Sequence, residues 1–97
     1  MYFSWDRKKS DWTLEHRGFS FAAAAQIFDD PDLLIEPAKS KMGEARSKAI
    51  GLLPDSDVPI VLTVIYTERE EDGKETIRII SARRADKRES RRYSRLP

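Results

Sequence analysis

The segment that most constrains the fold is the apolar run IVLTVIYT at 60–67, which is followed by a second apolar run, IRIISAR, at 77–83. Both runs are rich in β-branched residues, and the Asp72-Gly73 dipeptide between them is a strong signal for a two-residue hairpin turn. A nearly continuous apolar strand is typical of the centre of a sheet. The sequence therefore predicts a central antiparallel hairpin with strands over 60–67 and 76–83.

The residues at the N-terminus predict a short strand over 2–5 and then a helix. Asp6 can cap this helix, which should run to about position 17 because Gly18 is placed to stop it. Trp12 and Leu14 are expected to anchor the helix to the core.

A second helix is predicted from the segment FAAAAQIF at 21–28. Its apolar residues fall on one face at helical spacing, and Ser20 can cap its start. Asp29-Asp30-Pro31 should end it, because the residue before a proline disfavours the helical conformation.

The remaining segments complete an α+β domain. Strand signals over 33–35 and 46–53 are separated by a predicted loop, and a third helix over 86–95 can be capped by Asp86. We therefore expect one domain over 1–97. It should contain a small antiparallel sheet, two N-terminal helices and a basic C-terminal helix, with the helices packed on one face of the sheet.

The composition excludes several classes of protein. With 39% hydrophobic and 36% charged residues, the chain is polar but has enough apolar residues for a core. It has no cysteine, which excludes disulfides and thiolate metal sites. The N-terminus lacks the apolar stretch of a signal peptide, and no apolar run is long enough to span a membrane, so a cytoplasmic protein is expected.

Positive charge is concentrated at the C-terminal end, although the whole chain carries only +1. The segment 83–97 has seven basic residues against Asp86 and Glu89, a net charge of +5, so the segment 1–82 sums to −4. Such a patch on a mildly acidic body suggests a specific anionic partner. Within the predicted third helix and just before it, one stripe of arginines recurs at helical spacing with few acids to pair with: Arg84, Arg88, Arg91 and Arg95.

The predicted hairpin also brings arginines together. A two-residue turn places these pairs opposite each other: Glu71–Lys74, Arg69–Thr76, Thr67–Arg78 and Ile65–Ile80. Arg69 and Arg78 then share one face, whereas Arg83 falls on the other, more apolar face. Neighbouring guanidinium groups repel unless an anion lies between them, and arginine matches the geometry of phosphate oxygens. A phosphate-bearing ligand is one interpretation; the alternative is that both arginines are solvated or pair with Glu44 or Glu70.

Several segments together resemble, in order, the BrnT family of ribonuclease toxins from type II toxin–antitoxin pairs. They are WDRKK, RGFSF before the alanine-rich helix and FDDP, GEARSKAIG, VIYTER and IRIISARRADKRESRRY, and the resemblance covers nearly the whole chain, from Phe3 to Tyr93. The resemblance implies a RelE-like fold, cleavage of RNA, and neutralisation by a BrnA-like antitoxin in a hetero-oligomer. The antitoxin carries a ribbon-helix-helix part, so operator DNA would be bound only through the antitoxin.

The chain departs from this family at the end of the first predicted helix. Where the family usually has Lys-His-Gly, this chain has His16-Arg17-Gly18. If the family histidine transfers protons, this chain must use His16, one residue away, or manage without a histidine.

RNA cleavage without a metal or other cofactor uses the 2′-OH of the substrate as nucleophile. The protein then supplies a base, an acid and cations that stabilise the phosphate. Glu68 is the leading candidate base, although it could equally be an ordinary strand-end carboxylate. His16 and Tyr93 are further catalytic candidates that could instead have structural roles, and the acids lack the spacing typical of a metal site. Arginines complete the candidate site, with Arg69 and Arg83 as catalytic cations and with these substrate-binding residues: Arg46, Arg78, Arg84, Arg88 and Arg91.

The arginines alone leave two further interpretations open. A non-catalytic nucleic-acid-binding module would use the same basic surface to hold phosphates. A protein-interaction domain would dock an acidic peptide on the basic helix. Strong salt-dependent binding that leaves RNA intact would indicate the binding module.

Overall fold

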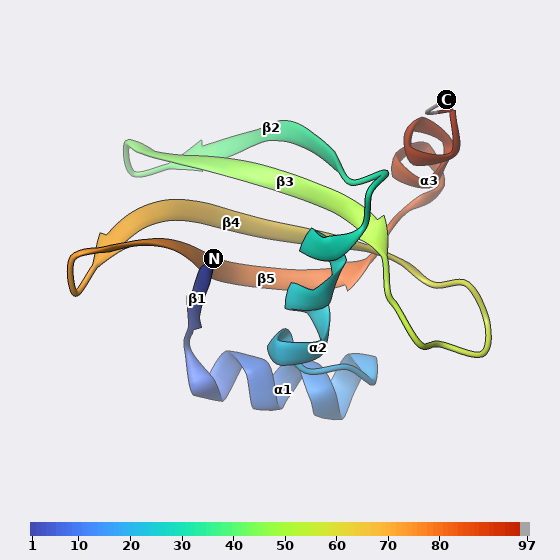
Figure 1. Cartoon of the computed structure of the whole chain (residues 1–97), viewed down its shortest axis with the longest axis horizontal. Helices are drawn as coiled ribbons and strands as arrows, with labels where there is room; N and C mark the ends of the chain where they lie inside the picture. The colour runs from blue at the N-terminus through green and yellow to red at the C-terminus, as the bar shows by residue number, and fades with distance from the viewer. Residues whose placement is uncertain (96–97) are drawn as a thin grey trace.

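The computed structural model describes residues 1–95, which form a five-stranded sheet with packed helices (Figure 1). The strand order across the sheet is β1-β5-β4-β3-β2, so the α+β class is confirmed. The elements in chain order are β1 (Tyr2–Trp5), α1 (Arg7–Arg17), α2 (Phe21–Ala25), a 3₁₀ helix η1 (Gln26–Asp29), β2 (Leu34–Lys41), β3 (Glu44–Leu52), β4 (Val61–Glu71), β5 (Lys74–Arg84) and α3 (Lys87–Ser94).

The sheet is mixed rather than antiparallel, which corrects the expectation from the sequence. The pairs β2–β3, β3–β4 and β4–β5 are antiparallel, but β1 runs parallel to β5, with Phe3 opposite Ile77. Short hairpins force antiparallel pairing only between consecutive strands. Most of the chain separates β1 from β5, so their relative direction is not fixed by a turn.

The predicted capping residues mark the ends of the helices. The Asp6 carboxylate accepts hydrogen bonds from two backbone N–H groups of α1, and Gly18 ends this helix with a φ of 88°. The Ser20 hydroxyl caps α2, but the segment expected as one second helix divides into α2 and η1. Asp86 and Glu89 form a reciprocal capping box at the start of α3.

The main core lies between the sheet and the segment formed by α2 and η1, and we call this side of the sheet the helix face. Buried side chains from both layers meet there: Phe19, Phe21, Ala24, Ile27, Ala49, Leu62, Val64, Tyr66, Ile79 and Ala82.

The α1 helix is not anchored by the two residues expected from the sequence. Trp12 and Leu14 are 47% and 52% exposed, whereas the buried residues of α1 are Ser10 and Thr13. The Ser10 hydroxyl accepts a hydrogen bond from the backbone N–H of Phe21 at 3.0 Å. Because α1 has no continuous apolar stripe, polar contacts of this kind position it.

A β-bulge between β4 and β5 changes the register halfway along the hairpin. On the turn side of the bulge the expected pairing is confirmed, with Thr67 opposite Arg78. On the other side Ile65 pairs with Ser81 rather than with Ile80, which corrects the expected register.

From Ser81 onward, the bulge shifts β5 by one residue. Side chains expected on one face of the sheet therefore point to the other face. Ala82 pairs with Val64 and is fully buried in the main core. Arg83 pairs with Thr63 and lies on the opposite side, not on the helix face as expected.

The α3 helix also packs on the side opposite the main core, so the expectation that all helices share one face is wrong. Its Glu89 side chain is 1% exposed and accepts a hydrogen bond from the Thr63 hydroxyl. Thr63 alternates with the core residues Leu62 and Val64 and therefore points away from them. Figure 1 shows α3 beside the end of the sheet near β2 and β3.

Candidate nucleic-acid interface

The side of the sheet opposite the main core carries a group of cationic side chains, and we call it the basic face. Alternation along β3, β4 and β5 places these residues there: Arg46, Lys48, Arg69, Arg78 and Arg83. The sequence correctly predicts that Arg69 and Arg78 share a face. The bulge adds Arg83 to the same side.

Glu44 partly neutralises the basic face. Its carboxylate oxygens lie 2.9 Å from Arg69 Nη2 and 4.0 Å from Arg46 Nη2. Within residues 1–95, no ion pair involves Arg78, and Arg46 Nε is buried without a hydrogen-bond partner. One carboxylate thus serves two arginines, and this part of the face retains donors for an anion.

Glu89 neutralises the other end of the basic face. It receives two hydrogen bonds from Arg83, at 2.6 and 3.0 Å, and its carboxylate lies 2.9 Å from Lys48 Nζ. Burial alone would raise the pKa of Glu89, but the bonds from Arg83, the backbone N–H of Asp86, Lys48 and Thr63 outweigh it and lower this pKa far below the ordinary value. Arg83 is thereby committed to an internal ion pair.

Further polar contacts fix α3. Arg92 forms a bidentate pair with Glu36, at 2.6 and 2.9 Å. The Tyr93 hydroxyl donates to the Asp30 carboxylate, and burial together with this bond raises the pKa of Tyr93. Tyr93 therefore has a structural partner and is poorly placed to donate a proton elsewhere. The arginines of the predicted stripe are all exposed: Arg84, Arg88, Arg91 and Arg95.

A groove of about 430 Å³ lies between α1 and the basic face, and we call it the α1 groove. Among the nine described residues that line it, none is acidic. They are Lys9, Trp12, Thr13, Arg17, Phe21, Lys41, Arg46, Ile80 and Ser81. The groove therefore combines cationic groups with one exposed aromatic ring. Proteins that bind single-stranded nucleic acids commonly combine these two features.

His16 lies beside this groove, stacked on the indole of Trp12 with ring centroids 4.3 Å apart. Its Nδ1 lies 2.9 Å from the backbone carbonyl oxygen of Trp12. A carbonyl can only accept, so Nδ1 must carry the hydrogen and Nε2 keeps a lone pair in the neutral ring. Arg17 lies with its guanidinium carbon 5.1 Å from the centroid of the same indole.

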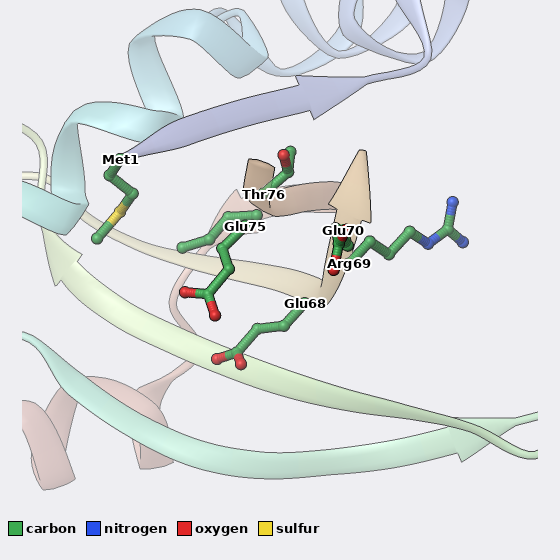
Figure 2. A pocket seen from close by; sticks show the side chains of 7 residues that line it. Met1, Glu68, Arg69, Glu70, Glu75 and Thr76 are labelled. Atoms are coloured by element: carbon green, nitrogen blue, oxygen red, sulfur yellow. The ribbon is translucent and has the colours of Figure 1, made fainter. Parts of the chain in front are cut away.

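A second cavity, of about 510 Å³, has the opposite charge character. It is lined by Met1, Glu68, Arg69, Glu70, Glu75, Thr76 and Ile77. Figure 2 shows the Glu68 and Glu75 carboxylates extending in one direction, while the Arg69 side chain extends away from them. Glu68 pairs with Ile77 and so belongs to the helix face. Glu68 therefore lines the same cavity as Arg69, but it points to the side of the sheet opposite Arg46, Arg78 and Arg83.

The part of the site that α1 contributes was not predicted from the sequence. Neither Lys9 nor Arg17 was predicted to be a binding residue, and Trp12 was expected to be a core residue. The eight-residue spacing between Lys9 and Arg17, with few apolar residues between them, is a signal that could have indicated an exposed helix side. Lys41 and Lys48 carried no comparable local signal, because their positions depend on how β2 and β3 pair.

Within residues 1–95, no group of three or more histidine, cysteine or carboxylate side chains is arranged to hold a metal ion. None of the helices in this part of the chain is long and apolar enough to cross a membrane. A family model described as the ribonuclease toxin, BrnT, of type II toxin–antitoxin systems matches residues 5–89. None of the curated proteins matches the chain.

Proposed function

Because the chain belongs to the BrnT family of ribonuclease toxins of type II toxin–antitoxin systems, we propose that it cleaves RNA on its basic face without a metal ion. The 2′-OH of the substrate attacks the adjacent phosphorus, a new 2′-O–P bond forms, and the P–O5′ bond breaks. The proton of the 2′-OH passes to a base on the protein, and the leaving O5′ takes up a proton. The products are a 2′,3′-cyclic phosphate and a 5′-OH.

The observation that carries this proposal is the grouping of Arg46, Arg69 and Arg78 on one face, where the single carboxylate of Glu44 lies against Arg46 and Arg69. Cations held in advance where negative charge develops stabilise a transition state more than mobile water does. Arginine also matches two phosphate oxygens at once. These residues are therefore the candidates for holding the phosphate that reacts, whereas Arg83 supports the face through its pair with Glu89.

His16 is the candidate for proton transfer. Its Nε2 is the lone-pair atom of the neutral ring, and the stack on Trp12 holds the ring beside the α1 groove. A positioned acid or base typically contributes about 10² to 10⁴ in rate. Glu68 faces the other side of the sheet, and the Tyr93 hydroxyl is bonded to Asp30, so both are weaker candidates for this role.

A type II family implies an antitoxin protein as partner. A BrnA-like antitoxin that covers the basic face would block access of RNA to Arg46 and Arg78, and the pair would form a hetero-oligomer in the cytoplasm. Contact with operator DNA would then be made by the antitoxin.

The test is incubation of single-stranded RNA with the isolated full chain in EDTA, followed by analysis of the RNA ends. We expect cleavage that leaves cyclic or 3′-phosphates and 5′-OH ends. Arg46→Ala/Arg78→Ala and His16→Ala should each lower kcat by about 10² or more, and Arg7→Ala, an exposed arginine of α1 outside the site, should not.

Two outcomes would overturn the proposal. RNA that stays intact while it binds with strong salt dependence would indicate a non-catalytic binding module. Cleavage that EDTA abolishes would contradict the metal-independent mechanism.

A further inference from the structure

We infer that the α1 groove binds the sugar–phosphate backbone of single-stranded RNA next to the phosphate that reacts. This inference rests on the proposed function, since it assigns the path of the same substrate. It adds a binding site formed by Lys9 and Arg17 of α1 together with Lys41, the residue of β2 that pairs with Glu44. None of these three is among the residues proposed to hold the phosphate that reacts.

The charge of the lining favours a polyanion. The groove presents Lys9, Arg17, Lys41 and Arg46, and no carboxylate is among its described lining residues. The other cavity of the molecule presents Glu68, Glu70 and Glu75 and would repel RNA (Figure 2). Glu44 lies 4.0 Å from Arg46, but no ion pair within residues 1–95 involves Lys9, Arg17 or Lys41. These three cations gain most by pairing with the phosphates of a bound strand, which also releases counterions.

Arg17 is held in a fixed orientation within the groove. Its Nη1 donates to the backbone carbonyl of Ala82 at 2.7 Å, and its guanidinium lies over the indole of Trp12. A guanidinium has five N–H donors, so most of them remain available after the bond to Ala82. Trp12 and Ala82 thus position Arg17 to bind phosphate oxygens, while His16 occupies the stacked position on the indole.

Arg46 connects the groove to the basic face. It lines the groove, it lies on the same side of the sheet as Arg78, and its Nε is buried without a hydrogen-bond partner within residues 1–95. A buried donor without a partner is costly, and a shift of the Arg46 side chain toward a bound phosphate would relieve this cost. A strand with one phosphate at Arg46 can therefore continue along the groove past Arg17 toward Lys9 and Lys41.

The experiment measures binding of a fluorescent single-stranded RNA in which every ribose is 2′-O-methylated, so that no 2′-OH can attack. The full chain is compared with Lys9→Ala, Lys41→Ala and Lys9→Ala/Lys41→Ala across a range of salt concentrations. The matched control is Lys8→Ala, which removes the same charge from the neighbouring position of α1 but does not line the groove. All three lysines are exposed, so these variants should fold.

We expect each single groove variant to raise Kd about fivefold at low salt, equivalent to about 1 kcal/mol. The slope of log Kd against log salt should decrease by about 0.7 for each phosphate contact that is lost. The double variant should lose about two such contacts, and Lys8→Ala should match the unmodified chain within twofold.

The outcomes separate this inference from the proposed function. If Lys9→Ala/Lys41→Ala binds with unchanged Kd and slope, the groove is not an RNA site, even if unmodified RNA is cleaved. If the groove variants lose binding as expected but unmodified RNA is never cleaved, the groove assignment holds and the ribonuclease proposal fails. If polyglutamate binds with the same dependence on Lys9 and Lys41 while the RNA does not bind, the groove is a docking site for an acidic peptide and the inference is overturned.

Discussion

Glu89 is the residue through which α3 and the basic face are joined. Its carboxylate holds Arg83 and Lys48, and it also accepts from Thr63 and from the backbone N–H of Asp86. Glu89→Gln keeps the shape of the side chain but leaves two cations without their shared anion. Because hydrogen bonds to charged groups contribute about 1.5–3 kcal/mol, we expect a loss of about 2 kcal/mol in unfolding free energy, measured by urea denaturation. Glu15→Gln, at an exposed position of α1, is the matched control.

The same residue makes stability depend on pH. The contacts of Glu89 lower its pKa in the folded chain below the unfolded value of about 4.3. Its stabilising contribution is therefore complete above that value and decreases as the pH falls below it. The unfolding free energy of the unmodified chain should fall more steeply below about pH 4.3 than that of Glu89→Gln. Parallel pH curves for the two proteins would contradict this role.

At the level of elements, the contact between η1 and β3 depends on Gly51. A Cβ atom there would lie 2.9 Å from Leu33 Cδ1 and 3.1 Å from Ile27 Cβ. Gly51→Ala should therefore push η1 away from β3 and destabilise the chain by about 1–3 kcal/mol. It should also weaken the 2.8 Å bond from the backbone N–H of Leu52 to the Asp30 carboxylate. Faster hydrogen exchange at the Leu52 amide, with the Ala85 amide as reference, would confirm the displacement, and unchanged exchange and stability would contradict it.

The elements also show how far the sequence could predict this structure. Features determined by residues close together in the sequence were predicted correctly. Asp6, Ser20 and Asp86 cap helices, and the Asp72-Gly73 turn sets the first pairs of the hairpin. The β-bulge at Ile80 has no such local signal in the sequence. The parallel pairing of β1 and the position of α3 likewise depend on contacts between distant segments.

The candidate site also contains some residues that the local sequence could place and others that it could not. Strand alternation from a known turn was enough to place Arg69 and Arg78 on one face. Arg83 was assigned to the other face because the bulge was not foreseen, and its buried partner Glu89 is supplied by α3. Trp12 belongs to the α1 groove, although its residue type alone suggested a core position. The sequence pattern within one helix or strand does not show which other helix or strand it contacts.

At the scale of the whole molecule, the small net charge of +1 hides two poles. Arginines and lysines gather on the basic face and in the α1 groove, whereas Glu68, Glu70 and Glu75 line the other cavity. Such a separation orients an approaching polyanion over distances of about one Debye length, roughly 10 Å at 0.1 M salt. The acidic pole should therefore slow association with RNA at low salt without taking part in cleavage.

Two roles for Glu68 can now be distinguished: a distant negative charge that repels RNA, or the catalytic base. The two roles predict opposite effects of Glu68→Gln. If Glu68 acts only through the field of the acidic pole, Glu68→Gln leaves kcat unchanged and raises kcat/KM for single-stranded RNA at low salt. The gain should disappear near 1 M salt, where the Debye length falls to about 3 Å, and Glu75→Gln in the same cavity should behave alike. If Glu68 were the base, kcat would fall by about 10² to 10⁴ at every salt concentration. We expect the first result, because Figure 2 shows the Glu68 carboxylate directed away from the Arg69 side chain, and steady-state cleavage kinetics at low and high salt distinguish the two.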